Sequence, residues 1–424
     1  MNPGTPIAWI DARHPNAKRK MWGLTLLERN IRELELQGIE TIVLLTQSGE
    51  DPTNSFCHGI SQTTRLRVEA ADQSGPLPSL FSLIQSSQVP VIALEGHALN
   101  DRRLLKILVE SANDLAILPE YGPAPAGLAR LSRDTLEALE GVVAFSLTEL
   151  LQTAVAENRL PCFDLSQFDT YMDNLRRRVP PYAIKVEDEA TYRAAEKVLK
   201  RTVQKGVLEV VGKFIHPPLE FGAVRLIAES KITPNQITLV WVLLALSVIP
   251  LYLTGHLLLG TLFAALVGIL DGVDGKLARL TLRFSEAGDK LDHISGTIND
   301  ALWYMALGWY FSGGNLHSRP ALFAALLLGS YLIHRIVPGL FRGFFAREIY
   351  DYQKIDEVAR LIGARVNNNV WVFLIGLLLE KPLETFYLIS VWMAITALWF
   401  IVRFFWVSYQ QRGVEKQFEL SRIR

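Results

Sequence analysis

Three aspartates near the middle of the chain are the residues best suited to chemistry. Asp271 and Asp274 are three positions apart, so one helix face carries both carboxylates, and Asp292 follows on the next predicted helix. Glycines and Arg279 lie among them, directly after an apolar stretch. Ionisable groups at the end of a membrane segment are costly and usually functional. The pattern therefore predicts a divalent-cation site that handles phosphate.

Composition separates the chain into two unlike halves. Of its 424 residues half are hydrophobic and the formal charge is zero, yet residues 1–200 read as soluble protein, whereas long apolar runs alternate with short basic segments from Ile237 onward. The two cysteines, Cys57 and Cys162, support neither a disulfide framework nor a cysteine-based zinc site. The start of the chain lacks a basic region followed by an apolar core, so we expect no cleaved signal peptide, and we expect no nucleic-acid partner.

Six apolar stretches predict an all-α, six-helix transmembrane domain over residues 237–410. Several are shorter than the ~20 residues of a straight span, and flanking polar helix can complete them. The fifth stretch could instead be a buried core helix. The stretches are Ile237–Thr254, Leu257–Leu270, Ile298–Phe311, Ala321–Pro338, Val370–Leu379 and Phe386–Val407.

Basic residues gather in the loops on one side of these stretches. By the positive-inside rule, both termini and the aspartate motif then face the cytoplasm of a multi-pass protein in a lipid bilayer. Lys276, Arg279 and Arg283 lie on that side, as do Arg342, Arg347, Lys354, Arg360 and Arg365, and the tail over residues 411–424. We interpret His334 and Arg335 as anchors at the lipid interface.

Short β-branched runs alternate with helical patterns in residues 1–190, which predicts a doubly wound α/β domain. Such sheets bind ligands at the carboxyl ends of their strands. The expected helices are Leu24–Gln37 and Asp101–Ser111, and the expected strands are Ile7–Ile10, Ile39–Leu45, Val89–Leu94, Asp114–Leu118 and Val142–Phe145.

The segment from Gly23 to Arg29, ahead of Gly38, resembles the sugar-phosphate nucleotidyltransferases. In that family a glycine-rich loop follows the first strand, but here residues 11–15 contain no glycine, and backbone amides cannot closely cradle a triphosphate through such side chains. His97 stands where the resemblance implies a metal-holding aspartate, and Lys185 stands near the second. We interpret the domain as nucleotidyltransferase-like but degenerate, with retained cytidylyl transfer as the alternative.

Residues 191–236 connect the two halves. Phe221–Ala228 could form an amphipathic helix on the membrane surface, with Lys213, Arg225 and Lys231 near anionic head groups. A plain interdomain linker fits the same residues.

The motif around the aspartates resembles the signature of the CDP-alcohol phosphatidyltransferases, integral-membrane enzymes of phospholipid synthesis. Its spacing is D-x2-D-G-x2-A-R-x8-G-x3-D, and Thr233–Thr238 before the first apolar stretch also fits that family. A nucleotidyltransferase-like domain fused to such a domain resembles the bifunctional inositol-1-phosphate cytidylyltransferase/di-myo-inositol-phosphate-phosphate synthase proteins. The resemblance implies that an alcohol, or a phosphorylated polyol, attacks a CDP-activated lipid or polyol and that CMP leaves.

This chemistry suits the residue types. Mg²⁺ or Mn²⁺, as two ions, can orient the diphosphate and stabilise charge on its oxygens. The expected metal ligands are Asp271, Asp274 and Asp292, with Asp292 also catalytic. The expected donor-binding residues are Asn235 and Thr238 at the cytidine end, Gly272 and Gly275 where a nucleotide approaches the helix, Ala278, Arg279 for a forked phosphate contact, and Gly288. The alternative is a buried polar cluster that seals a helix bundle.

One position departs from the family signature. A fourth aspartate, thought to deprotonate the attacking hydroxyl, is replaced by Gly296. Asp300 lies one further turn along, roughly 12 Å from Asp292 by helix rise, and is our candidate for a substitute catalytic base; Asp289 and His293 are worse placed. The chain could thus be an active transferase or a silent scaffold that binds a CDP-alcohol. Arg365 could hold an acceptor phosphate or belong to a topogenic loop, and a homodimer through the membrane helices stays open.

Overall fold

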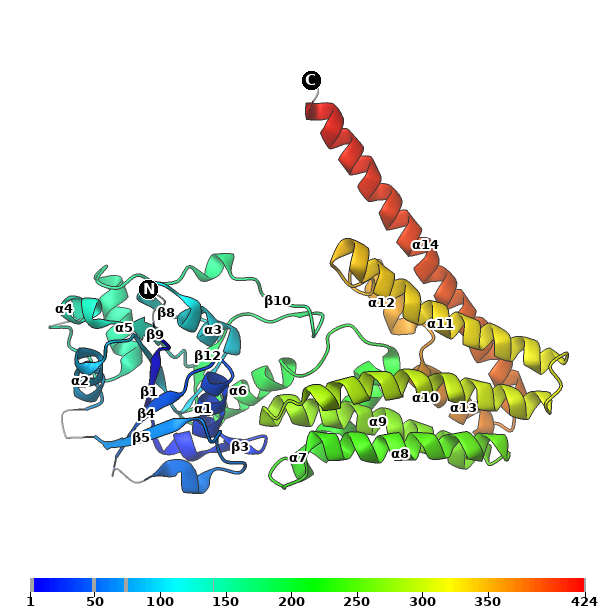
Figure 1. The fold of residues 1–424 in the computed structure, drawn as a ribbon, viewed down its shortest axis with the longest axis horizontal. Helices are drawn as coiled ribbons and strands as arrows, with labels where there is room; N and C mark the ends of the chain where they lie inside the picture. Colours follow the sequence, from blue (N-terminus) through cyan, green and yellow to red (C-terminus); the bar gives the residue numbers. More distant parts are fainter. Residues whose placement is uncertain (1–3, 48–50, 72–74, 140, 423–424) are drawn as a thin grey trace.

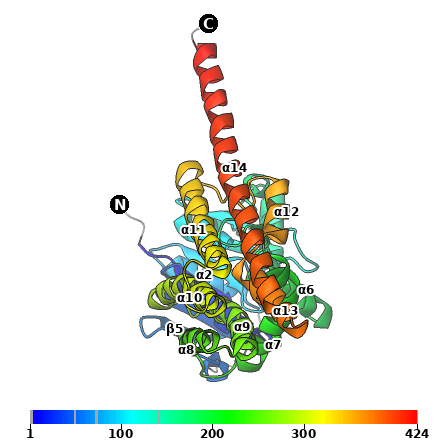
Figure 2. The same ribbon diagram turned by 90° about the vertical axis from the view of Figure 1, so that its right-hand side faces the viewer.

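The computed structural model describes residues 4–47, 51–71, 75–139 and 141–422. An α/β domain and a set of long helices lie end to end, and the last helix projects away from both (Figure 1). The long helices lie side by side when viewed from their far end (Figure 2).

A six-stranded sheet forms the centre of the α/β domain. Its strands are β1 (Ile7–Asp11), β4 (Thr41–Thr46), β5 (Arg65–Ala70), β6 (Val91–Glu95), β8 (Leu115–Ile117) and β9 (Leu128–Leu131), in the order β5-β4-β1-β6-β9-β8. The first four are parallel, whereas β9 runs antiparallel to both β6 and β8. The predicted α/β class is confirmed, but the sheet is mixed and not parallel throughout.

Successive side chains of β1 pack into two separate hydrophobic cores, one on each face of the sheet. Ala8 and Ile10 pack in one cluster with Leu27 and Leu105, while Trp9 on the opposite face packs with Leu80 and other residues of a second cluster. Because successive strand residues point to opposite faces, helices must cover both sides of the sheet. These helices are α1 (Leu26–Glu35), α2 (Leu77–Ser86), α3 (Arg102–Glu110), α4 (Leu136–Leu139), α5 (Leu147–Ala156) and α6 (Glu189–Arg201).

The predicted strand at Val142–Phe145 is wrong. These residues form the approach to α5, and the side chains of Val143 and Phe145 are about 80% exposed (80% and 81%). A β-branched and aromatic run forms a strand only where a neighbour pairs with it, and β9 takes that place beside β6. The predicted helix Leu24–Gln37 is shorter than expected, because Leu24–Thr25 forms β3, which pairs with β2 (Lys20–Met21).

Small pairs of strands and short turns complete the domain. The pairs are β7 (Ala98–Asn100) with β12 (Ala183–Lys185) and β10 (Tyr171–Met172) with β11 (Arg177–Arg178). Four 3₁₀ turns cover Pro15–Lys18, Pro52–Ser55, Arg133–Thr135 and Leu165–Gln167, and a π-turn covers Val211–Ile215.

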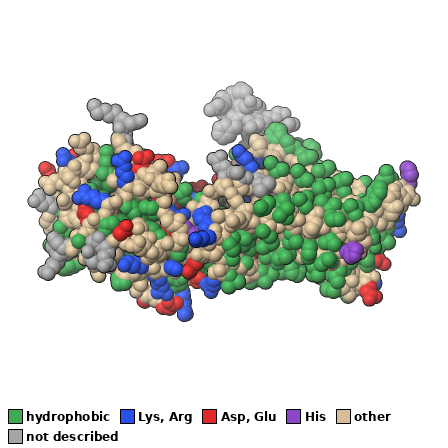
Figure 3. Space-filling model, turned by 60° about the horizontal axis from the view of Figure 1, so that its bottom comes forward, with side chains coloured by type: hydrophobic (Ala, Val, Ile, Leu, Met, Phe, Trp, Pro, Cys, Tyr) green, Lys and Arg blue, Asp and Glu red, His purple; other side chains and the backbone are tan. Residues whose placement is uncertain are grey.

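The second half of the chain is helical. Its helices are α7 (His216–Ile227), α8 (Pro234–Leu253), α9 (Leu257–Thr281), α10 (Glu286–Ser312), α11 (Arg319–Phe345), α12 (Lys354–Ile362), α13 (Val366–Leu378) and α14 (Pro382–Arg422). Contacts link six of them in a closed ring, in the order α8, α9, α13, α14, α11, α10 (Figure 2). Apolar side chains cover the helices on the face seen in Figure 3, whereas charged side chains gather on the α/β domain.

Within the described part of the chain, five helical segments are long and apolar enough to cross a membrane. They are Pro234–Leu253, Leu257–Thr281, Arg319–Phe345, Lys354–Leu378 and Pro382–Gln411. All six predicted stretches lie in helices, but α10 is not among the five candidates, so the six-span count is not confirmed.

The two halves share one hydrophobic cluster. Met21, Trp22 and Leu26 of the α/β domain pack with Val273 and Leu277 of α9. The buried Arg29 guanidinium reaches across and donates to the carbonyl of Leu280 at 2.7 Å, near the end of α9. The α/β domain is thus attached directly to the helix that carries the motif.

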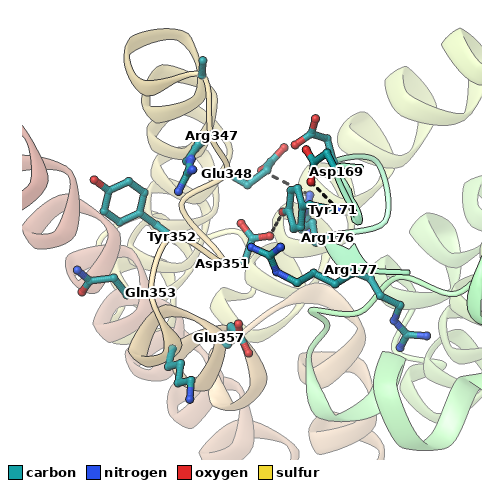
Figure 4. A pocket seen from close by; sticks show the side chains of 14 residues that line it. Asp169, Tyr171, Arg176, Arg177, Arg347, Glu348, Asp351, Tyr352, Gln353 and Glu357 are labelled. Carbon is teal, nitrogen blue, oxygen red and sulfur yellow. Dashed lines mark hydrogen bonds and ion pairs between the residues drawn. The ribbon is translucent and has the colours of Figure 1, made fainter. Parts of the chain in front are cut away.

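A cavity of about 590 Å³ lies between the β10–β11 hairpin and the segment that joins α11 to α12 (Figure 4). The Tyr171 hydroxyl donates to Asp351, and Arg176 lies 3.5 Å from Glu348. These pairs form a second link between the α/β domain and the helices.

Candidate functional site

Helix caps place the motif residues. Thr233 caps α8 by accepting from the amide of Gln236, whose side chain accepts from the Thr233 amide in return, and Pro234 follows at the first helical position. Ser285 caps α10 by accepting from the amide of Gly288 at 3.2 Å. Both helices therefore begin beside the end of α9.

The ends of these three helices enclose a cavity of about 300 Å³, which we call the motif cavity. Six of the seven residues predicted to bind the donor line it, and Asp274 lines it as well. The six are Asn235, Thr238, Gly275, Ala278, Arg279 and Gly288. A Cβ at Gly288 would lie 2.3 Å from Asn235 Oδ1, so a larger residue here would displace the Asn235 amide from its place in the motif cavity.

Asp274 is buried and held by two donors. Its Oδ2 accepts from the Thr238 hydroxyl at 2.6 Å and from the Trp241 indole at 2.9 Å. Trp241 was missed by the sequence analysis, because an apolar aromatic residue inside a membrane stretch gives no signal of a polar role. The two bonds fix the carboxylate while its second oxygen makes no side-chain hydrogen bond among the described residues.

Asp271 differs from Asp274. Its side chain is exposed and makes no hydrogen bond or ion pair with the described residues. It lines a second cavity of about 360 Å³ inside the helix ring, which we call the basic cavity. Three cationic side chains, from Lys205, Arg335 and Arg365, line the same cavity.

Asp300, the predicted substitute base, also lines the basic cavity. Its carboxylate accepts from Arg335 at 3.1 Å and from the Tyr331 hydroxyl at 3.3 Å. Arg335 lines this cavity and is partly exposed, so its role as a lipid-interface anchor stays a prediction; His334 is buried and contacts the ring of Phe400, so its interpretation as such an anchor is wrong. A Cβ at Gly296 would meet no atom within 4 Å.

The side chain of Asp292 lies outside the described residues, as do those of Asp289 and His293. Only their place in α10 is described. Among the side chains that are described, no group of three or more His, Cys, Asp or Glu residues could hold a metal ion. Asp271 and Asp274 are three residues apart on one helix, and neither forms a hydrogen bond or ion pair with a lysine or arginine among the described residues, so both are carboxylates of the kind that holds a hard cation.

Gly272 has a different role from the expected one. A Cβ there would lie 1.9 Å from Oε1 of Glu220, so this glycine admits a carboxylate of α7 and not a nucleotide. Glu220 forms a buried ion pair with Lys276. Burial raises the pKa of Glu220, and Lys276 opposes that shift. A helix is present over most of the predicted residues, as α7, and it packs its buried carboxylate against α9; its position on the membrane surface stays a prediction.

Glu209 connects the linker to the basic cavity. It is buried, lies 3.6 Å from Arg360 and 3.8 Å from Arg365, and accepts from Asn367 at 3.1 Å. Burial alone would raise its pKa, yet Arg365 and the Asn367 amide hold the pKa of Glu209 below its usual value. The carboxylate therefore stays ionised and restrains Arg365.

The strand ends of the α/β domain form a separate polar cluster, which we call the N-terminal cleft. Asp11 accepts both hydrogen bonds of the Arg13 guanidinium, at 2.8 and 3.0 Å, and Glu95 accepts from the Thr148 hydroxyl at 3.1 Å. The rings of His14 and His97 stack at 4.3 Å. Burial, with His14 and Lys185 nearby, lowers the pKa of His97 to about 3, so its ring is neutral at physiological pH.

Comparisons with known proteins identify a family for the second half of the chain and several similar proteins. Residues 231–408 match the model of the CDP-alcohol phosphatidyltransferase family. The chain is 32% identical over 189 residues to the bifunctional IPC transferase and DIPP synthase of Thermococcus kodakarensis, covering 42% of this chain and 40% of that protein. It is 33% identical over 87 residues to the phosphatidylinositol phosphate synthase of Corynebacterium glutamicum, covering 20% of this chain and 40% of that protein. The chain thus spans about two fifths of the length of each of these relatives.

Solved structures give weaker likenesses. The phosphatidylinositol phosphate synthase of Mycobacterium tuberculosis with CDP-DAG bound aligns at 16% identity and a TM-score of 0.33, over 45% of this chain and 93% of that one. A structure of the same enzyme holds manganese and citrate, with the same identity and TM-score, over 45% of this chain and 89% of that one. The inositol-1-phosphate CTP transferase of T. maritima aligns at 14% identity and a TM-score of 0.33, over 46% of this chain and 97% of that one.

Proposed function

We propose that this chain, whose residues 231–408 form a CDP-alcohol phosphatidyltransferase domain, moves a phosphate-linked group from a CDP-activated lipid or polyol to an alcohol and releases CMP. One observation carries the proposal. The motif cavity and the basic cavity lie along the same helix, with Asp274 lining the first and Asp271 lining the second. A donor in one cavity and an acceptor in the other would meet at these carboxylates.

The donor occupies the motif cavity in this proposal. Its diphosphate lies at the aspartates, Arg279 makes a forked contact with a phosphate, and Asn235 and Thr238 face the nucleoside. Thr238 also holds Asp274 in place, so donor binding and carboxylate geometry depend on the same side chain. Mg²⁺ or Mn²⁺, as two ions held by Asp271, Asp274 and Asp292, would polarise the diphosphate and stabilise the charge that develops on its oxygens.

The acceptor enters the basic cavity. Three cationic side chains against the two carboxylates of Asp271 and Asp300 leave a surplus of positive charge, which favours a phosphorylated alcohol over a neutral one. Glu209 restrains Arg365 toward this cavity. Asp300 is the carboxylate placed to take the proton of the acceptor hydroxyl, although Arg335 pairs with it in the structure.

We propose that the α/β domain does not catalyse cytidylyl transfer. Arg13 forms an ion pair with Asp11, so the N-terminal cleft lacks a second unpaired carboxylate beside Glu95 that could share a metal; Thr148 donates to Glu95, and the rings of His14 and His97 stack. The domain boundaries at 190, 236 and 410, the cytoplasmic position of both termini and of the site, and a homodimer through the membrane helices stay part of the proposal.

Purified protein in detergent tests the transferase. With Mn²⁺, labelled CDP-diacylglycerol or a CDP-polyol, and a panel of alcohols and phosphorylated polyols, CMP should appear with a phosphorylated acceptor. Retained binding of the CDP donor without CMP release for any acceptor would favour a silent scaffold. Pyrophosphate release from CTP would instead show that the N-terminal cleft is active.

Gly296→Asp is the sharper variant. A Cβ at this position would meet no atom within 4 Å, and Gly296 lines the basic cavity, so this position has room for the start of a side chain. We expect the variant to be faster than the natural protein, and Gly296→Ala, the matched control, to leave the rate unchanged. Activity that appears only in Gly296→Asp would identify the natural chain as the scaffold. Asp300→Asn should remove the natural rate if Asp300 is the base.

A further inference from the structure

A third cavity, which we call the interdomain cavity, lies between the α/β domain and the end of α9. Its volume is about 220 Å³, and it shares Arg279 and Phe284 with the motif cavity. The two cavities are therefore neighbours across one arginine and one aromatic ring. Its remaining wall comes largely from the α/β domain, including Arg29, Asn100 and Arg102, none of which lies in the family-matched segment.

The positions along α9 show which end of a donor could reach this cavity. Asp271 and Arg279 are eight residues apart, about 12 Å along the helix axis. A diphosphate that lies between the aspartates and Arg279 thus directs the nucleoside of the same molecule beyond Arg279, toward Phe284. The reactive end points the other way, toward the basic cavity.

The chemistry of the wall suits a nucleobase. Phe284 is half exposed, and the Arg102 guanidinium lies over its ring at 5.1 Å. An aromatic ring backed by a guanidinium is a stacking surface for a base. The side chains of Arg29 and Asn100 are 2% and 3% exposed, yet Arg29 Nε and Asn100 Oδ1 have no hydrogen-bond partner among the described residues. Both atoms are shielded from solvent, so the polar edge of a cytosine would reach them only when this wall of the cavity opens; buried polar atoms without partners are rare.

We propose that the α/β domain completes the donor site: the cytosine end of the CDP donor occupies the interdomain cavity, against Phe284 and Arg102. This rests on the transferase function proposed above. The α/β domain then acts as a binding module for the membrane site, with its own cleft filled by its own side chains. A donor site confined to the motif cavity would contact Phe284, which lines both cavities, but would not need Arg102.

Binding of CMP by the full-length protein tests the proposal without requiring turnover. Isothermal titration in detergent with Mn²⁺ should show CMP affinity about 10-fold weaker in Phe284→Ala and several-fold weaker in Arg102→Ala, because each removes part of the stacking surface. Lys106→Ala is the matched control, since Lys106 lies on the same helix as Arg102, pairs with Glu110 and lines no part of the cavity. Its affinity for CMP should equal that of the natural protein.

Titration with pyrophosphate distinguishes binding of the base from binding of the phosphates. Its affinity should be unchanged in both variants, because the phosphates lie at the aspartates. Arg102→Lys keeps a cation opposite Glu33 and so guards against a folding defect, but it lacks the planar guanidinium and should still bind CMP more weakly.

Unchanged CMP affinity in Arg102→Ala would overturn the proposal whatever Phe284→Ala does, because Phe284 also lines the motif cavity. An equal loss of CMP and pyrophosphate affinity would also overturn it, because the cavity would then hold phosphate. If the natural protein binds neither CMP nor pyrophosphate with Mn²⁺ present, the proposed transferase function itself fails.

Discussion

In the N-terminal cleft Asp11 is paired with the guanidinium of Arg13, whereas on α9 Asp271 is exposed and makes no hydrogen bond or ion pair with the described residues. Both places gather carboxylates at the end of buried secondary structure. A carboxylate that already has a cationic partner gains little from a metal ion, while an unpaired one beside a second carboxylate is costly until a cation arrives. The partners of each carboxylate, more than their number, separate a filled cleft from a site prepared for a ligand.

The polar groups around the two sites also differ. His97 is buried, stacked on His14 and neutral, so no charge is present where the resemblance to the nucleotidyltransferases implies a metal-holding aspartate. On α9 the neighbouring polar groups orient a carboxylate and do not neutralise it, since Thr238 and Trp241 donate hydrogen bonds to Asp274 without bringing a charge.

Removal of divalent cations should produce the largest difference between the two regions. Chelation with EDTA should abolish CMP release, and added Mn²⁺ should restore it, because the charge on the diphosphate oxygens then has no counter-charge. The same treatment should leave the unfolding temperature of the α/β domain unchanged, since its carboxylates carry protein partners. A lower unfolding temperature of that domain after chelation would contradict the contrast.

Asp271→Asn should have the next largest effect. We expect CMP release to fall about 1,000-fold, roughly 4 kcal/mol of transition-state stabilisation, because the amide is a poor ligand for a hard cation. The exposed side chain makes no internal bonds, so the folded fraction should not change. Glu380→Gln, in the turn before α14 and far along the chain from the motif, is the control and should keep the full rate. Calorimetry should show weaker Mn²⁺ uptake by Asp271→Asn alone.

The sequence predicted the motif cavity well because its residues are local. Asn235, Thr238, Gly275 and Arg279 lie within short stretches at helix ends, where caps and spacing are readable. Lys205, Glu209, Glu220 and Trp241 were missed, because each reaches the site only through packing between segments far apart in the sequence. Gly272 was assigned to the nucleotide for the same reason, since nothing in the sequence shows that Glu220 of α7 approaches it.

The fold was predictable to a similar depth. β-branched and apolar runs in the sequence predicted four of the six strands in the central sheet and the six apolar helices. The strand β9 was missed, and Val142–Phe145 was chosen in error, because pairing beside β6 depends on contacts that a short run does not encode. The edge strand β5 was missed because Arg65, Arg67 and Glu69 interrupt its apolar pattern.

Acid should destabilise the N-terminal cleft through His97. Its pKa is about 3 in the folded protein and about 6.5 in the unfolded chain, so the unfolded state binds more protons between these values. The stability that the neutral ring contributes is complete above pH 6.5 and is lost as the pH falls, by about 2 kcal/mol at pH 5. His97→Phe keeps a ring for stacking and should reduce this loss. Hydrogen exchange of the β1 and β6 peptides at pH 7.5 and pH 5 measures it, and equal pH dependence in both proteins would contradict the prediction.

The smallest expected effect comes from the ion pair that fills the cleft. Asp11→Asn removes the charge opposite Arg13, which is about one quarter exposed, and should cost about 1 kcal/mol of α/β domain stability or less. CMP release should not change, because this carboxylate lies outside all three cavities that we assign to the donor and acceptor. Hydrogen exchange of β1 measures the first quantity and the CMP assay the second. A large loss of activity in Asp11→Asn would mean that the N-terminal cleft takes part in the reaction, and the contrast between a filled cleft and a prepared site would then be wrong.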